Sequence, residues 1–166
     1  MSEADEQERL VLDSVDRFLE RHVRPVAMKL EHDDEYPHEI VAKMKEMGLF
    51  GCVIPQNLGG LGLRPSTYAK IIERISVEWM SISGILNSHL IMARIVDKMG
   101  TDEQRARFLP QFATGELRGG LALTEPDCGT DLQAIRTVAK RDGDDYVING
   151  TKTWISNGIE GSCFAL

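Results

Sequence analysis

The chain has 166 residues, of which 42% are hydrophobic and 27% are charged, and its formal net charge is −7 at pH 7. These values are ordinary for a soluble globular protein. The acidic balance argues against a nucleic-acid partner, which would require a basic face. No stretch approaches the roughly 18 consecutive apolar residues that span a membrane, so we expect no integral membrane segment.

The cysteines and the N-terminus indicate the compartment. Cys52, Cys128 and Cys163 are widely spaced and odd in number, which fits neither a disulfide framework nor a zinc site. Residues 1–8 are acidic and polar and do not resemble a secretory signal. We therefore expect a cytoplasmic protein without a bound metal. His89 is expected to be a core residue rather than a ligand.

Apolar residues recur at helical spacing in the first part of the chain. The first predicted helix runs from about residue 4 to about residue 30 and is kinked or split at Pro25. Another helix follows Pro37 and ends at Gly48, where a glycine favours a C-terminal stop. The next residues, 49–63, are rich in glycine and predict a long irregular connection.

Three more helices complete this half. One begins at Pro65, and the next runs from about Ile82 to Met99 and is apolar around most of its circumference. Residues 101–104 form a capping box, in which the threonine and glutamine side chains satisfy free backbone N–H groups. The helix that follows should end near Gly115. Residues 1–118 are therefore predicted to form a helical domain.

From residue 119 onward the pattern changes to short strands and tight turns. The predicted strands are residues 121–124, 136–141, 146–148, 151–156 and 162–166, with hairpin turns at Asp142-Gly143 and Asn149-Gly150. We therefore predict an α+β protein, in which an N-terminal all-α bundle is followed by the first strands of an antiparallel β-barrel-like domain, residues 119–166. So small a sheet would have an open edge and a small core, so we expect this domain to be incomplete.

Two segments carry the strongest functional signal. The first is LALTEPDCGTD, residues 121–131, and the second is YVINGTKTWISNG, residues 146–158. In this order, after a helical bundle, they resemble the two signature segments of the acyl-CoA dehydrogenase family. Residues 48–51, 59–62 and 98–104 resemble parts of that family's N-terminal domain. The resemblance implies an FAD-dependent oxidoreductase of fatty acid metabolism and β-oxidation, a flavoprotein that removes hydrogen from the α and β carbons of an acyl-CoA thioester and passes the hydride to flavin N5.

The first segment holds donors that a flavin dinucleotide needs. Gly129 lets the backbone approach a phosphate without a Cβ in the way, and Thr130 offers a hydroxyl and an N–H at the same point. By resemblance, Leu121, Leu123 and Thr124 lie along the flavin, with Thr124 bonding near the C2 oxygen and N1. Thr130 is also expected to contact the substrate. Many members have an aromatic residue in place of Leu121 and a serine in place of Thr130, and neither change removes the expectation of FAD binding.

The second segment is expected to complete the cofactor site. Strand alternation would put Trp154 and Ser156 on the same side of their strand. By resemblance, Trp154 packs against the flavin and Ser156 donates toward N5 and the C4 oxygen. In most members the catalytic base is a glutamate of a C-terminal domain, so we expect no catalytic residue here. We also expect the chain alone to bind FAD weakly or not at all and to be inactive.

The resemblance further implies an acyl-CoA substrate, an electron-transfer flavoprotein as acceptor, and a homo-oligomer, either a dimer or a tetramer. Residues 79–87, which by resemblance line the acyl pocket, hold no arginine or lysine, and this favours a monocarboxylic acyl group. Two alternatives remain open. One is an acyl-CoA oxidase or flavin monooxygenase of the same architecture. The other is a non-catalytic assembly half, whose open last strand is completed by a second polypeptide.

Overall fold

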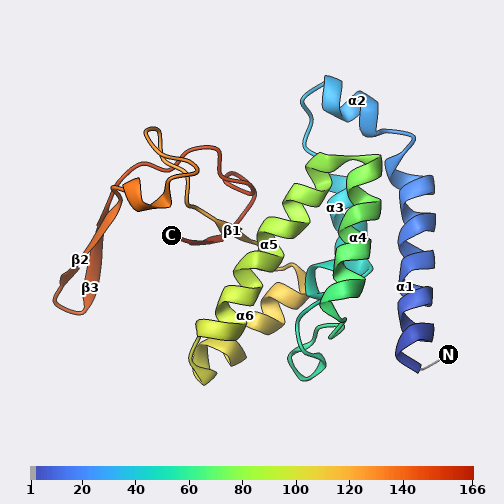
Figure 1. The fold of residues 1–166 in the computed structure, drawn as a ribbon, viewed down its shortest axis with the longest axis horizontal. Coiled ribbons are helices and arrows are strands. Elements are labelled where there is room, and N and C mark those ends of the chain that lie inside the picture. Colours follow the sequence, from blue (N-terminus) through green and yellow to red (C-terminus); the bar gives the residue numbers. More distant parts are fainter. Residues whose placement is uncertain (1–2) are drawn as a thin grey trace.

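The computed structural model describes residues 3–166 and shows a helical bundle with short strands on one side (Figure 1). The helices are α1 (Glu3–Phe18), its π-helical continuation η1 (Leu19–Val23), α2 (Ala27–His32), α3 (His38–Glu46), α4 (Pro65–Glu78), α5 (Met80–Met99) and α6 (Asp102–Thr114). The strands are β1 (Gly119–Leu121), β2 (Val138–Asp142), β3 (Asp145–Asn149) and β4 (Cys163–Ala165). Single 3-10 turns occur at Leu49–Gly51, Gln56–Leu58 and Leu132–Ala134. The predicted order of a helical domain followed by strands is confirmed.

The helix ends follow the local signals in the sequence. The first predicted helix is split around Pro25, between η1 and α2. Gly48 and Gly115 both adopt left-handed backbone conformations, with φ of +72° and +69°, at the ends of α3 and α6. The capping box of α6 is present, because the Gln104 N–H donates to Thr101 Oγ1 at 3.2 Å while the Thr101 N–H donates to Gln104 Oε1 at 2.8 Å.

The main core lies between α1, α3, α4 and α5. Its fully buried side chains include Val15, Met44, Phe50, Ile71 and Ile82. A smaller cluster around Leu109 and Phe112 joins α6 to α5. The burial of these apolar side chains is the main favourable contribution to the free energy of folding.

The helix α5 is less buried than its composition predicted. Ile85, Ile95 and Val96 are only half-buried, and Ile91 is 37% exposed. Among the strands, β1 makes the most extensive contact with this helix. Within residues 3–166 no helix is both long and apolar enough to cross a membrane.

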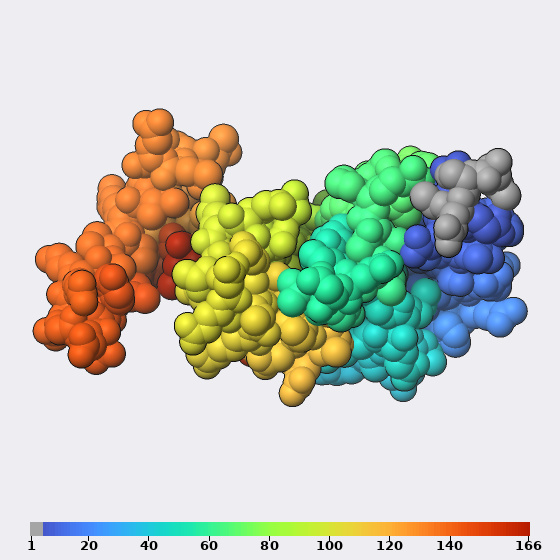
Figure 2. Space-filling model, turned by 90° about the horizontal axis from the view of Figure 1, so that it is seen from below, coloured from blue at the N-terminus to red at the C-terminus, as the bar shows by residue number. Residues whose placement is uncertain are grey.

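The strands form two separate pairs, and no closed barrel forms within the described residues. The hairpin of β2 and β3 is antiparallel, with Asp142 opposite Asp145, and it projects away from the bundle (Figures 1 and 2). For the other pair, the prediction of an antiparallel sheet is wrong. The strands β1 and β4 run parallel, with Gly119 opposite Cys163 and Leu121 opposite Ala165. The long connection between these two strands allows the crossover that a parallel pair requires.

The predicted strand at residues 151–156 is absent, and Asn149-Gly150 is not a hairpin turn. Asn149 is the last residue of β3 and lies opposite Val138. At Gly150 the chain passes directly over Thr137, where an added Cβ would lie 2.2 Å from the threonine hydroxyl. The following residues bond to the 121–131 segment instead of to β3, which explains why the third strand of the predicted meander does not form.

Candidate functional site

The carboxylate of Glu125 is the centre of the region where the two signature segments meet. Glu125 is only 6% exposed. Its side chain accepts hydrogen bonds from the backbone N–H groups of Arg136 at 2.7 Å and Thr137 at 2.9 Å, and also from the Thr137 hydroxyl. The ammonium of Lys152 donates to the same carboxylate at 2.9 Å. This buried anion therefore has donors from two distant parts of the chain.

These donors set the charge of the site. The Thr137 hydroxyl, the Arg136 N–H and the Lys152 ammonium together lower the pKa of Glu125 to about 2. Glu125 is therefore ionised at neutral pH. Its negative charge makes it a structural anion here rather than a proton donor.

The same lysine fastens the second segment to the first. Lys152 also donates to the Leu123 carbonyl at 2.9 Å, and the N–H of Thr153 donates to the Thr124 carbonyl at 3.0 Å. Leu121, Leu123 and Thr124 are half-buried along this line of contact. The structure thus joins the predicted Leu123 and Thr124 to the second segment through Lys152 and Thr153, which were not predicted as site residues.

The loop after Thr124 is a tight turn with an open tip. Glu125 and Cys128 exchange backbone hydrogen bonds of 2.9 and 3.2 Å. Beyond the turn, Gly129 and Thr130 are exposed, and a Cβ added at Gly129 would meet open space. The side chain of Asp131 accepts the Gln133 N–H at 3.2 Å, so it holds the loop. The backbone at Gly129 is therefore free to be approached from outside.

Trp154 is the most distinctive side chain of the region. It is 88% exposed and has a left-handed backbone with φ of +57°, which is uncommon for a bulky residue. Ser156 is exposed nearby in the chain. The prediction that strand alternation aligns these two side chains is wrong, because residues 151–156 are not a strand and Trp154 itself breaks the extended conformation.

An apolar cavity of about 400 Å³ opens beside this indole. Its lining residues come from the second segment, from β4 and from the residues directly after β1 and β4: Ala122, Lys152, Trp154, Ile155, Gly158, Phe164 and Leu166. An exposed indole next to an apolar hollow suits a flat, partly apolar ring, and the open loop at Gly129 and Thr130 suits a phosphate. The residues present therefore fit a flavin dinucleotide.

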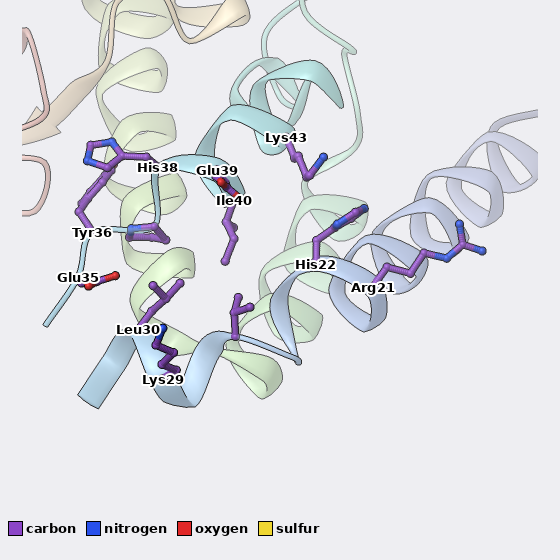
Figure 3. A pocket seen from close by; sticks show the side chains of 12 residues that line it. Arg21, His22, Lys29, Leu30, Glu35, Tyr36, His38, Glu39, Ile40 and Lys43 are labelled. Carbon is purple, nitrogen blue, oxygen red and sulfur yellow. The ribbon is translucent and has the colours of Figure 1, made fainter. Parts of the chain in front are cut away.

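A second cavity of about 430 Å³ lies between η1, α2 and α3 (Figure 3). Side chains of both charges line it, including Arg21, Lys29 and Lys43 together with Glu35 and Glu39. None of the predicted site residues faces this cavity. Within residues 3–166 no cluster of three or more His, Cys, Asp or Glu side chains is placed to hold a metal ion.

Sequence reasoning missed the residues that join the segments. Glu125 and Lys152 are separated by 27 positions, so no local spacing pairs them. Asn157 was also missed, although it is buried and bonded to the backbone of β1. The only available signal was that each of these polar residues lies within a signature segment.

Comparisons with known proteins agree with the geometry. The model of the acyl-CoA dehydrogenase N-terminal domain matches residues 5–116, and the model of the acyl-CoA dehydrogenase middle domain matches residues 120–166. The (2S)-methylsuccinyl-CoA dehydrogenase of Cereibacter sphaeroides is 37% identical over 154 residues, which are 92% of this chain and 28% of that protein. The short-chain-specific acyl-CoA dehydrogenase of Clostridium acetobutylicum is 35% identical over 161 residues, which are 96% of this chain and 42% of that protein. The chain thus spans less than half the length of these relatives.

Solved structures show the same fold. A structure described as the electron transferring flavoprotein of Acidaminococcus fermentans matches with a TM-score of 0.90 and 29% identity, over 99% of this chain and 43% of that one. A glutaryl-CoA dehydrogenase from Mycobacterium smegmatis in complex with FADH2 matches with a TM-score of 0.82 and 26% identity, over 95% of this chain and 40% of that one. The domain models and the relatives together show that this chain belongs to the acyl-CoA dehydrogenase family.

Proposed function

We propose that this chain forms the FAD-binding part of an acyl-CoA dehydrogenase that introduces an α,β double bond into an acyl-CoA thioester. The observation that carries the proposal is the junction of the two segments through Thr124, Glu125, Lys152 and Thr153, beside an exposed Trp154. The names of the relatives support an acyl-CoA substrate, and a neighbour in complex with FADH2 supports the cofactor.

Each predicted residue has a distinct task in this proposal. Trp154 covers one face of the isoalloxazine, and the half-buried Leu121 and Leu123 lie along its edge. Thr124 and Ser156 donate hydrogen bonds to the ring, which favours the negative charge of the reduced state. Bound FAD supplies the acceptor for the β-hydride.

The exposed loop is proposed to bind the charged part of the ligand. Gly129 and Thr130 offer backbone N–H groups and a hydroxyl to the diphosphate, and Thr130 also contacts the substrate. No residue of this chain is assigned as the base. We propose that the base belongs to a C-terminal domain of the parent enzyme, so this chain alone has no turnover.

The remaining features of the proposal concern the parent enzyme. We propose a cytoplasmic homo-oligomer that acts on a monocarboxylic acyl group and passes electrons to an electron-transfer flavoprotein. The matching structure described as an electron transferring flavoprotein supports this acceptor. Residues 79–87, which hold no arginine or lysine, support the monocarboxylic substrate.

Fluorescence anisotropy of FAD titrated with the purified chain tests the cofactor site. We expect weak but saturable binding that is lost in Trp154→Ala. The matched control is Ile159→Ala, which removes a 95% exposed apolar side chain directly after the same segment. Equal loss in both variants, or no loss in either, would contradict the assignment of Trp154 to the flavin.

A further inference from the structure

A single glycine residue of β1 is held on both sides by buried polar side chains. The N–H of Gly119 donates to Nδ1 of His89 at 3.1 Å. The carbonyl of Gly119 accepts a hydrogen bond from Nδ2 of Asn157 at 2.9 Å. His89 is fully buried and Asn157 is 8% exposed, so both bonds are shielded from water.

His89 is in turn fixed within the helical bundle. Its Nε2 lies 3.1 Å from the Phe50 carbonyl and 3.0 Å from the Phe112 carbonyl, and the rings of both phenylalanines pack edge-on against the imidazole. Because Nδ1 accepts the Gly119 N–H, the proton of the neutral ring lies on Nε2 and is donated to these carbonyls. The imidazole therefore connects α6 and the Leu49–Gly51 turn to β1.

Asn157 connects the same point to the second segment. Its Nδ2 also donates to the Ile85 carbonyl of α5 at 3.1 Å. Its backbone is left-handed, with φ of +62°, a conformation that asparagine tolerates better than most residues. We call the contact between Gly119, His89 and Asn157 the joint. Asn157 directly follows Ser156, and Gly119 lies two residues before Leu121, so both proposed flavin segments begin or end at this joint.

The approach of β1 to α5 is too close for side chains. A Cβ at Gly119 would lie 2.5 Å from Met92 Cγ, and a Cβ at Gly120 would lie 2.8 Å from the Ser156 carbonyl oxygen. Ser88 adds a second attachment, since its hydroxyl accepts the Leu121 N–H at 3.4 Å. The joint is thus a fixed contact between the bundle and both segments.

We propose that His89 and Asn157 are positioning residues of the flavin site, which set the two flavin segments in register with each other and with α5. This inference rests on the proposed FAD site, and neither residue touches the cofactor. It extends that site to His89, a side chain of the helical bundle that lies 30 positions before its partner Gly119. The two segments are coupled to each other and to the bundle through the N–H and C=O groups of Gly119.

Two amide variants of His89 separate its hydrogen bond to Gly119 from its hydrogen bonds to the bundle, and both lose the ring contacts with Phe50 and Phe112. In His89→Asn, the amide oxygen replaces the Nδ1 acceptor, so the Gly119 bond is kept while the bonds to Phe50 and Phe112 are lost. In His89→Gln, the amide nitrogen replaces the Nε2 donor, so the bundle bonds are kept while the Gly119 bond is lost. Asn157→Gly removes the second clamp and keeps the left-handed backbone.

Backbone hydrogen exchange measures the coupling without any ligand. We expect His89→Gln and Asn157→Gly to accelerate exchange in both segments, residues 119–124 and 153–158, and to leave α1 and α4 unchanged. His89→Asn should lower the global stability. The exchange rates of the two segments relative to those of the bundle should stay as they are in the wild type. Acceleration confined to residues 119–124 in His89→Gln, or no acceleration, would overturn the inference.

The FAD titration is then repeated on the same variants. We expect the dissociation constant to rise about tenfold in His89→Gln, in line with the loss of one buried hydrogen bond, and to change little in His89→Asn. A wild-type chain that gives no saturable FAD signal would contradict the weak FAD binding proposed for this chain, and hydrogen exchange would still test the positioning role. Unchanged FAD affinity in His89→Gln, with binding intact in the wild type, would overturn the positioning role alone.

Discussion

The ammonium of Lys152 lies 2.9 Å from the carboxylate of Glu125, and this buried pair of residues, 27 positions apart in the sequence, joins the two segments. The two side chains are 12% and 6% exposed. Both groups also bond to backbone, Lys152 to the Leu123 carbonyl and Glu125 to the N–H groups of Arg136 and Thr137. The two side chains therefore hold backbone segments in place in addition to neutralising each other's charge. This distinguishes them from the exposed ion pairs of α1.

Removing the cation of this pair should loosen the whole junction. In Lys152→Met, the Glu125 carboxylate stays buried without its counter-charge, which is much more costly than loss of a surface pair. We expect faster hydrogen exchange at residues 123–125, 136–137 and 153. The control is Arg136→Met, because the Arg136–Asp127 pair has side chains that are 77% and 70% exposed. If the two variants behave alike, the ion pair has no special role.

Acid should weaken the junction at a defined pH. The folded-state pKa of Glu125 is lowered from 4.5 to about 2, so its contribution to stability is complete above about pH 4.5 and is lost as the pH falls toward 2. Hydrogen exchange at residues 136–137, measured between pH 2 and 6 and corrected for the intrinsic rate, should show this loss. Glu125→Gln should abolish the pH dependence, and a persistent transition in that variant would assign it to another group.

The buried imidazole should give a second acid transition at higher pH. Burial lowers the pKa of His89 from 6.5 to about 4, with smaller contributions from the charges of Arg118 and Lys45. The neutral ring is favoured in the folded state, so its contribution is complete above about pH 6.5 and is lost as the pH falls to 4. A shift of this size corresponds to roughly 3 kcal/mol of unfolding free energy.

Urea unfolding at a series of pH values measures this second transition. The slope of stability against pH between 4 and 6.5 should be smaller in His89→Gln than in the wild type. The control variant is His32→Asn, at an exposed histidine. A wild-type slope retained in His89→Gln would show that His89 does not titrate in this range.

Two glycines of the helical domain should respond oppositely to alanine. A Cβ at Gly60 would lie 2.1 Å from the Ile54 carbonyl oxygen, so Gly60→Ala forces two parts of the backbone apart. We expect a loss of about 1–3 kcal/mol, as for other overpacked sites. Gly84, inside α5, has no neighbouring atom within 4 Å of an added Cβ, so Gly84→Ala should gain about 0.5–1 kcal/mol in unfolding free energy. Urea denaturation of both variants checks the signs, and a stabilised Gly60→Ala would refute the close approach.

The sequence predicted best the features that local interactions determine. The stops at Gly48 and Gly115 and the cap at Thr101 depend on residues within one helical turn, and all three are confirmed. The strands were harder, since their partners lie far away in the chain. Residues 151–156 have strand composition, but Lys152 and Thr153 bond to the first segment instead. The parallel partner of β1 could not be read from local pattern either.

For the candidate site, the resemblance suggested which residues matter, and the structure added how they are connected. Leu123 and Thr124 do lie against the second segment. The supporting side chains, Glu125, Lys152 and Asn157, are ordinary polar residues in sequence and become recognisable only by their burial and partners. Their roles in FAD binding remain predictions.

The most direct test of the central claim is the response of the two indole N–H signals in a nitrogen-15 NMR titration with FAD. Trp154 is 88% exposed beside the apolar cavity, whereas Trp79 is 8% exposed and its indole N–H donates to Glu31 in the helical bundle. Trp79 is therefore an internal control. We predict a saturable shift of the Trp154 signal, together with the amides of Gly129 and Thr130, while the Trp79 signal stays fixed. Unchanged Trp154 at saturating FAD, or equal shifts of both indoles, would contradict a flavin site at the junction of the two segments.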